Sequence, residues 1–275
     1  MLVVAAVATG CGGGGGDGPA DAVAVDAAVD AIDAPPGPTA ADLFDESQIR
    51  TLDLTVAAAD WDWLNANPLL EQYVPADLTW NGVTVARLGV RYKGSVGSLR
   101  LCFDAQGNRR CPKLSMKLDF DEYVADQRFV GLEHLNLHAM MRDASAMKER
   151  LVYGLYRAAG VAAPRAAHAR VRVNGADLGV YVNVESVDHE FTRRNFANGD
   201  GNLYEGTLSD FRPGWTGTFD PEGNGDRSDL TPIVDALQLT DDAAMDAALA
   251  AALDREQFES YWAMEVIVGQ WDGYA

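Results

Sequence analysis

Lysine, glycine and serine residues near the middle of the sequence have the types and spacing needed to hold an anion. Residues 93–98 (KGSVGS) place Lys93 and Ser95 among small residues, where backbone amides can approach a phosphate closely. Lys113 and Lys117 lie four residues apart in an alternating segment, so on a strand both side chains lie on one face. An ordinary loop and a solvated strand face would give the same pattern, and these alternatives stay open.

Three acidic residues complete the candidate chemistry. Glu149, between two basic residues of an expected helix, could pair with a strand lysine and fix its position, or could simply be exposed. Glu185 ends an expected strand, where it could meet the polar edge of a ligand. Asp272 follows a long apolar helix and precedes a glycine, so it could present a general base or belong to a C-terminal turn. Lysines for phosphate charge and carboxylates for a metal ion are what a nucleotide site requires.

The elements that must position these residues form an α+β pattern, with a β-rich part (about 48–186) before a helical part (about 187–275). Alternating apolar residues and two Asn-Gly turns, at 81–82 and 174–175, predict the strands, and helical spacing with a possible cap at Asp143 or Ser145 predicts the first long helix. The expected strands are 51–56, 77–92 (a hairpin), 113–120, 132–137, 168–173 and 178–185. The expected helices are 61–65, 145–158, 187–196, 228–239, 242–253 and 255–270.

Charge excludes one class of partner. The chain has 275 residues, with 41 acidic and 22 basic side chains, and a net charge of −19. Residues 1–49 carry eight acids and no Lys or Arg, residues 50–200 carry eighteen acids and nineteen bases, and residues 201–275 carry fifteen acids and three bases. A surface this acidic repels phosphate backbones, so we expect no nucleic-acid binding. Only the middle region could face an anion.

The N-terminus has the features of an export signal. The apolar residues 2–8 are followed by small residues and Cys11, which resembles the lipobox of bacterial lipoproteins, in which Cys11 is lipidated after cleavage. We therefore expect a signal peptide at 1–11, a disordered Gly/Ala/Asp/Pro tether at 12–45 and a folded domain at 46–275. The protein would be exported and anchored to a membrane through Cys11, in the periplasm or at the cell surface. The alternative is a disordered apolar tail with an idle cysteine.

Two further cysteines flank a short loop. Cys102 and Cys111 enclose eight residues with a Gly-Asn turn signal, so they could lie close enough to form a disulfide in an oxidising compartment. Two free thiols, or half of a metal site, are the alternatives. No metal-ligand spacing of Cys and His appears in the sequence, so we assign no metal site to protein side chains. Residues 220–231 partly fit a calcium-binding EF-hand loop but have Thr231 where glutamate is required, and an acidic loop is the competing interpretation.

A series of segments resembles the CotH family, the spore-coat-H-type atypical protein kinases. Their order and spacing over about residues 48–275 carry the resemblance, rather than any single segment. The matching segments are 90–95 (VRYKGS), 113–120 (KLSMKLDF), 135–137 (LNL), 143–150 (DASAMKER), 160–165 (GVAAPR), 174–181 (NGADLGVY), 185–188 (ESVD), 201–204 (GNLY) and 271–273 (WDG).

This resemblance implies a diverged protein-kinase-like fold with ATP and Mg²⁺ between a β-rich N-lobe and a helical C-lobe. Lys117 or Lys113 would hold ATP phosphates, with Glu149 as the helix partner and the 93–95 segment near the nucleotide. Asp272 would match the catalytic aspartate that orients or deprotonates the acceptor hydroxyl.

Family members continue beyond this point to a metal-binding aspartate, so we expect an incomplete C-lobe and impaired transfer. The expected activity is phosphate transfer from ATP to Ser/Thr of surface or coat proteins. The alternatives are a non-catalytic surface or spore-coat assembly protein and, from six tryptophans alone, a carbohydrate-binding lipoprotein.

Overall fold

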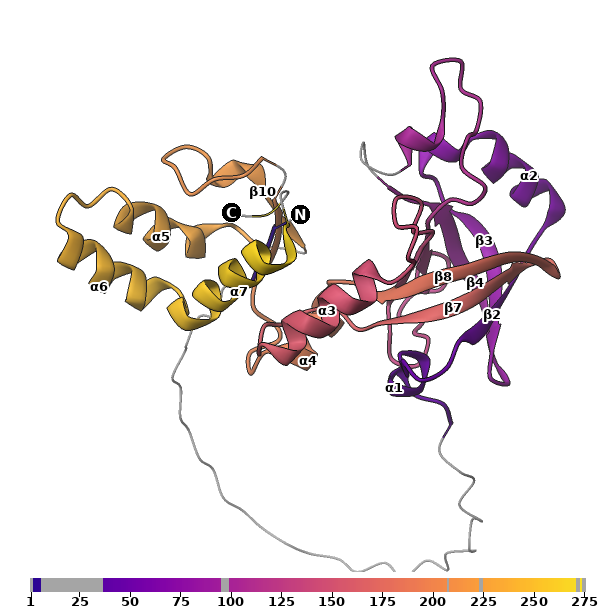
Figure 1. The fold of residues 1–275 in the computed structure, drawn as a ribbon, viewed down its shortest axis with the longest axis horizontal. Coiled ribbons are helices and arrows are strands. Elements are labelled where there is room, and N and C mark those ends of the chain that lie inside the picture. Colours follow the sequence, from indigo (N-terminus) through magenta and orange to yellow (C-terminus); the bar gives the residue numbers. More distant parts are fainter. Residues whose placement is uncertain are drawn as a thin grey trace, which may run out of the picture.

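The computed structural model describes residues 2–5, 37–94, 99–206, 208–222, 225–270 and 273. A β-rich part and a mostly helical part follow one another along the chain (Figure 1). The expected α+β class is confirmed. No helix among the described residues is long and apolar enough to cross a membrane.

The β-rich part is a closed barrel of seven strands. Its spatial order is β2-β3-β4-β5-β6-β8-β7, and neighbouring strands are antiparallel except at one seam. At that seam β2 and β7 run parallel, with Leu54 aligned to Val173, which closes the sheet. The barrel strands are β2 (Arg50–Val56), β3 (Val74–Trp80), β4 (Val83–Tyr92), β5 (Met116–Asp119), β6 (His134–His138), β7 (Ala166–Val173) and β8 (Ala176–Glu185).

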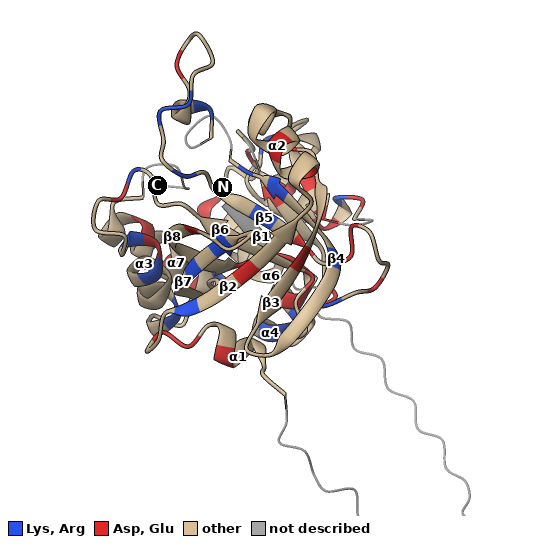
Figure 2. Ribbon diagram, turned by 90° about the vertical axis from the view of Figure 1, so that its right-hand side faces the viewer, with Lys and Arg blue, Asp and Glu red and all other residues tan. Residues whose placement is uncertain are grey.

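Local sequence explains most of these strands. Buried and exposed positions alternate along β3 and β7, as expected for a sheet with one face in the core. Both Asn-Gly turns have positive φ at both residues, the conformation that two-residue hairpin turns require. Figure 2 shows Lys and Arg positions along β5 and β7, and Asp and Glu positions on α1 and α2.

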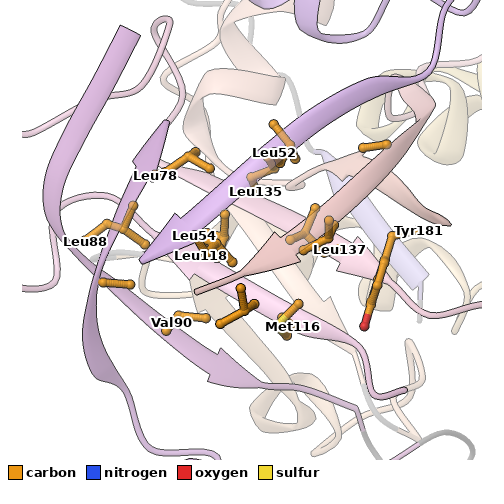
Figure 3. Close-up of a cluster of buried hydrophobic side chains, with 14 of the residues drawn as sticks. Leu52, Leu54, Leu78, Leu88, Val90, Met116, Leu118, Leu135, Leu137 and Tyr181 are labelled. Atoms are coloured by element: carbon orange, nitrogen blue, oxygen red, sulfur yellow. The ribbon is translucent and has the colours of Figure 1, made fainter. Parts of the chain in front are cut away.

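The interior of the barrel is apolar and fully packed (Figure 3). The side chains that meet there are all at most 1% exposed: Leu52, Leu54, Leu78, Leu88, Val90, Met116, Leu118, Leu135, Leu137 and Tyr181. Burial of a leucine-sized side chain contributes about 1.5–3 kcal/mol, so this cluster stabilises the closed barrel and fixes which face of each strand points outward.

Helices surround the barrel and make up most of the C-terminal part. They are α1 (Ala40–Leu43), α2 (Ala58–Ala66), α3 (Lys148–Ala158), α4 (His189–Asn195), α5 (Thr231–Ala236), α6 (Asp242–Ala252) and α7 (Arg255–Val268). Single 3-10 turns are η1 (Pro68–Leu70), η2 (Arg100–Cys102), η3 (Thr216–Thr218) and η4 (Ser228–Leu230). Asp188 caps α4, since its Oδ1 accepts hydrogen bonds from the backbone N–H groups of Glu190 and Phe191.

A second, small sheet lies in the C-terminal part. Its central strand is β9 (Leu203–Gly206), which pairs antiparallel with β10 (Phe219–Glu222) and with β1 (Leu2–Ala5). The sequence analysis did not predict this sheet. Its strands are four residues long, too short to show a clear alternation.

Several expected boundaries differ from the structure by up to three residues, and two of them lie next to the candidate site. The strand expected at 113–120 is only Met116–Asp119, and Lys113 lies before it. The helix expected from 145 begins at Lys148, because Ala146 has a positive φ of 56° that interrupts helical geometry. Asp143 still assists this helix, since its Oδ2 accepts a hydrogen bond from the backbone N–H of Lys148 at 2.7 Å.

Candidate functional site

The outer face of β5 and β6 carries a row of polar side chains. Met116 and Leu118 of β5 point into the core. Lys117 and Asp119, which alternate with them, therefore lie on the outer face of the strand. On the neighbouring strand Asn136 lies opposite Lys117, and His134 lies opposite Asp119. This face therefore places a lysine–asparagine pair next to an aspartate–histidine pair.

Lys93 joins Lys117 on this face. Its backbone N–H donates to the Ser115 carbonyl at 2.9 Å, and its Nζ donates to Asn136 Oδ1 at 2.8 Å. Burial, followed by the charges of Lys117 and Arg91, lowers the pKa of Lys93 to about 8. The structure thus brings two of the predicted lysines together and crowds their positive charges.

Glu149 approaches the lysines from α3, but its direct partner is a histidine. Its Oε2 lies 2.8 Å from His138 Nδ1, while its charge also acts to raise the pKa of Lys93. The helix is held in place by Tyr153, which packs against Val182 and Val184 of β8. The sequence analysis expected a lysine–glutamate pair; the structure has a histidine–glutamate pair beside the lysine.

Glu205 on β9 is a neighbour that the sequence analysis missed. Its charge also acts to raise the pKa of Lys93, so Glu205 brings negative charge to the neighbourhood of this lysine. Glu205 lies in the short segment 201–206 (GNLYEG). Nothing in that segment indicates that the glutamate approaches a lysine of the barrel.

Lys113 lies apart from the other two lysines. Its Nζ donates to the Val180 carbonyl and sits 4.5 Å from the centre of the Tyr181 ring, and burial lowers its pKa. It borders an open pocket of about 520 Å³ formed with Val180 and the loop 139–146. Of the two lysines considered for phosphate binding, Lys117 is the one grouped with Lys93.

Glu185 ends β8, as expected, but its carboxylate is held by two arginines. Arg165 donates to Oε1 from Nε and Nη2, and Arg194 donates to Oε1 from Nε and to Oε2 from Nη2. Its side chain is 2% exposed. The carboxylate thereby joins β8 to the segment before β7 and to α4, and we assign it this structural role rather than ligand contact.

Three of the predicted functional residues lie outside the described residues. They are Cys11, proposed for lipidation, Ser95 of the glycine-serine segment, and Asp272, proposed as the catalytic aspartate.

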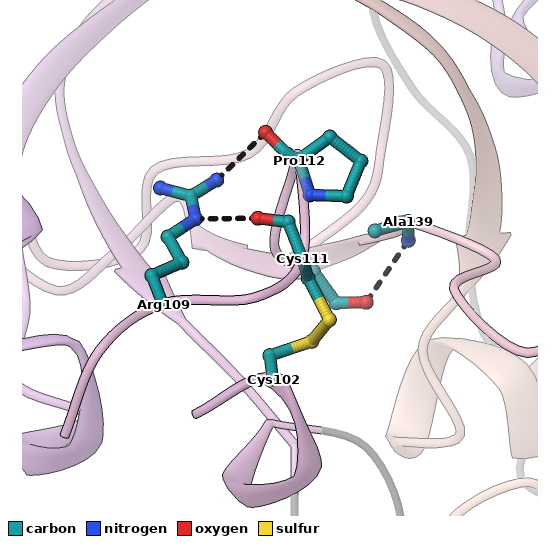
Figure 4. The surroundings of a disulfide bond; sticks show 6 residues. Cys102, Arg109, Cys111, Pro112 and Ala139 are labelled. Atoms are coloured by element: carbon teal, nitrogen blue, oxygen red, sulfur yellow. Dashed lines mark hydrogen bonds between the residues drawn. A yellow bond between two sulfur atoms is a disulfide. The ribbon is translucent and has the colours of Figure 1, made fainter. Parts of the chain in front are cut away.

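The expected disulfide between Cys102 and Cys111 is confirmed (Figure 4). It closes the hairpin-like loop next to β5. Arg109 braces the same loop by donating to the carbonyl oxygens of Cys111 and Pro112. The loop lies directly before the segment that leads into Lys113 and β5.

His134 is the centre of a constellation that the sequence analysis did not predict. Its Nδ1 lies 3.0 Å from Asp188 Oδ2, and its Nε2 lies 3.4 Å from Asp119 Oδ2 and 3.8 Å from Glu133 Oε1. Burial opposes a positive charge here, but hydrogen bonding to Asp119 and Asp188 outweighs it and raises the pKa of His134 to about 9. Burial alone would raise the pKa of Asp119, yet hydrogen bonding and the charge of His134 hold that pKa well below its usual value.

The segment considered as a calcium loop is divided between other structures. Asp220 and Glu222 lie in β10, paired with β9. Asp229 accepts hydrogen bonds from Asn202 Nδ2 and Tyr204 Oη. These contacts favour the acidic-segment interpretation.

The fold and the site together define an α+β protein with a seven-stranded barrel and a lysine pair on its outer face. The family described as "CotH kinase protein" matches residues 90–275, which is more than half of the chain, and the protein belongs to this family. A curated relative is "Inner spore coat protein H" of Bacillus subtilis (strain 168), 35% identical over 78 residues. That alignment covers 28% of this chain and 22% of the relative, so the matched part is about a fifth of the relative's length.

Proposed function

We propose that this protein is an exported CotH-type phosphotransferase domain that transfers phosphate from ATP to Ser/Thr hydroxyls of a surface or coat protein. The observation that carries this proposal is the Lys93–Lys117 pair on the outer face of the barrel. Two ammonium groups in one partly buried place disfavour each other's charge, and a bound polyphosphate removes that penalty. The family description supports the same chemistry.

The described residues fit the phosphates of a nucleotide. Lys93 is oriented by Asn136, and among the described residues Lys117 forms no ion pair, so its ammonium group is available to an anion. Arg91 is less available, because its guanidinium is paired with Glu71. Glu149 and Glu205 bring negative charge to the same place and act to raise the pKa of Lys93, which partly offsets the effect of burial.

In the proposed reaction the acceptor oxygen attacks the γ-phosphorus of ATP, and the bond from that phosphorus to the bridging oxygen of ADP breaks. The hydroxyl proton passes to Asp272, the residue assigned this role by family resemblance. Lys93 and Lys117 bind and orient the phosphates. Mg²⁺, which the family implies, would neutralise phosphate charge during transfer.

The proposed location rests on the disulfide and on the N-terminal sequence. Disulfides persist in oxidising compartments, which agrees with export, and Cys11 would attach the chain to a membrane through lipid. The name of the Bacillus subtilis relative agrees with a place outside the cytoplasm.

The test is ATP binding by the full chain, measured by calorimetry and by thermal shift with Mg²⁺ present. Lys117→Met and Lys93→Met each remove a charge-assisted contact, so we expect ATP affinity to fall by about 10–100-fold. Lys113→Met is the matched control and should leave the affinity unchanged. Equal losses in all three variants, or no ATP binding by the unmodified chain, would contradict the nucleotide assignment.

A second candidate function is non-catalytic assembly on a surface or spore coat, which the name of the curated relative favours. A binding module would not need the lysine pair to be charged. Lys117→Met and Asp272→Asn together would then leave attachment to the coat or surface intact, which microscopy of cells carrying the variant chain would show.

A further inference from the structure

Asp119, Asp121 and His134 form a compact group at the far end of the polar row from Lys93. One donor atom from each side chain lies within 4.8 Å of the other two. Asp119 ends β5, His134 begins β6 directly opposite it, and Asp121 follows in the turn after β5. Two acids and an imidazole thus converge where these strands meet the start of α4.

The carboxylates around His134 divide their oxygens in a consistent way. Asp119 uses Oδ1 to accept the backbone N–H groups of Asp121 and Glu122, and presents Oδ2 to His134. Glu133 binds Arg128 through Oε2 and presents Oε1 to His134. Asp119 and Glu133 are therefore each fixed in the scaffold by one oxygen and present the other to His134, while Asp121 Oδ2 accepts from Arg128 Nη1 at 3.2 Å.

Asp188 acts on the opposite side of the imidazole ring. Its Oδ1 caps α4 and its Oδ2 holds His134 Nδ1 at 3.0 Å. A carboxylate that accepts a hydrogen bond from one ring N–H fixes the tautomer that leaves the other nitrogen free to ligate a metal. This arrangement directs Nε2 toward Asp119 and Glu133.

The distances on the Nε2 side differ from those of a charged hydrogen bond. Such bonds are about 2.7–2.9 Å long, whereas Nε2 lies 3.4 Å from Asp119 Oδ2 and 3.8 Å from Glu133 Oε1. Two donors on one tetrahedral zinc ion, each about 2.0–2.1 Å from the metal, lie about 3.3 Å apart. The long Nε2–Asp119 Oδ2 hydrogen bond, at 3.4 Å, therefore matches the separation of two ligands on one ion, and Glu133 Oε1 lies farther away at 3.8 Å.

We propose that Asp119, Asp121 and His134 bind a divalent transition metal of the Zn²⁺ class, with Glu133 available as a fourth ligand and Asp188 as the orienting partner. An imidazole ligand favours such a metal over Mg²⁺ or Ca²⁺, which prefer oxygen donors alone. The ion would fasten the β5–β6 turn region together and, through Asp188, link it to α4. Lys117 borders this site, since its charge acts on both Asp119 and His134, but the metal proposal does not depend on the phosphotransfer proposal.

The experiment is titration of the chelator-treated full chain with Zn²⁺, followed by calorimetry, with Mg²⁺ and Ca²⁺ in parallel. We expect one Zn²⁺ per chain and a rise in melting temperature that Mg²⁺ and Ca²⁺ do not produce. His134→Gln should weaken Zn²⁺ binding by at least about 100-fold, and Asp188→Asn by about 10–100-fold. The matched control His168→Gln changes a histidine whose Nε2 contacts the Ala146 carbonyl, far along the sequence from the site, and should bind Zn²⁺ as the unmodified chain does.

Cobalt(II) substitution identifies the ligands independently. A tetrahedral spectrum with nitrogen and oxygen ligands, and without a thiolate charge-transfer band, supports the site; a thiolate band would assign the metal to Cys11 and overturn it. Absence of stoichiometric Zn²⁺ binding, or equal binding by His134→Gln, would mean that His134 is only an imidazolium held between carboxylates. If His134→Gln does not fold, Glu133→Gln decides the question, since it changes a side chain that is 30% exposed and should still weaken binding.

Discussion

The ammonium group of Lys93 lies in a place where burial and two neighbouring cations, Lys117 and Arg91, disfavour its positive charge. The groups that face it are Lys117 and Arg91, which lower its pKa, and Glu149 and Glu205, which raise it, with a net value of about 8. A bound polyphosphate needs this group protonated. The chemistry of the site should therefore depend on pH in a range where an ordinary lysine would not respond.

ATP affinity should be constant up to about pH 8 and should then fall by up to tenfold per pH unit, because the free protein loses the Lys93 proton that the complex requires. The unfolding free energy of the free protein should instead rise with pH between about pH 8 and 10.5. In that range the unfolded chain holds a proton that the folded chain has released.

Calorimetric titration of ATP across pH 7–10 measures the effect on binding. Lys93→Arg is the matched control, because a guanidinium stays charged throughout and should give a flat profile. Identical profiles for the two proteins would show that Lys93 does not contact the phosphates.

Part of the candidate site followed from residue types alone. Lys117 and Glu149 were recognisable because charged residues in alternating or helical segments can be assigned to a face, and Lys93 because it begins a glycine-serine segment. Asn136 and Glu205 were not, because each acquires its role from a partner far along the sequence. His134 was missed for the same reason, because Asp119 and Asp188, which hold its ring, come from separate segments.

At the scale of elements, Glu185 connects β8 to α4 through Arg165 and Arg194. Removing a buried charge from such a group leaves its partners uncompensated, so Glu185→Ala should lower the unfolding free energy by about 3–5 kcal/mol. ATP affinity of the folded variant should stay unchanged, because the carboxylate has no part in the proposed ligand set. Denaturant unfolding and ATP calorimetry on the same variant separate the two effects. A loss of ATP affinity with unchanged unfolding free energy would mean that Glu185 contacts the nucleotide.

The disulfided hairpin is a second element with a measurable contribution. Cys102 and Cys111 are nine residues apart, and a cross-link of that span restricts the unfolded chain by about 2–3 kcal/mol. The double variant Cys102→Ser with Cys111→Ser should therefore unfold at lower denaturant concentration than the oxidised chain. The reduced unmodified protein is the control and should match the double variant; equal stability of all three forms would mean that the loop is already ordered without the bond.

Individual elements were more predictable than their pairing. The Asn81-Gly82 hairpin and the end of α3 have local signals, namely turn residues and Gly160, which follows the helix with a positive φ. The parallel pairing of β2 with β7 has none, because the aligned Leu54 and Val173 are more than a hundred residues apart in sequence. A β-rich lobe was therefore foreseeable, whereas its closure into a barrel was not.

At the scale of the whole molecule, the family match and the folded unit have different boundaries. The match begins at residue 90, yet β2, β3 and most of β4 precede it. Without these strands the barrel opens, β5 and β7 lose neighbours, and core side chains such as Leu52 and Leu78 are absent. Each missing leucine removes about 1.5–3 kcal/mol of burial, and open strand edges promote aggregation.

A fragment of residues 90–275 should therefore be insoluble or should show no cooperative thermal unfolding by circular dichroism. The matched fragment of residues 37–275 retains all seven barrel strands and should unfold in one cooperative transition. It should also bind ATP, since Lys93 and Lys117 depend on the closed barrel for their position. Cooperative folding of the shorter fragment with its ATP affinity preserved would show that the lysine pair is positioned by β5 and β6 alone, and that the barrel closure contributes nothing to the site.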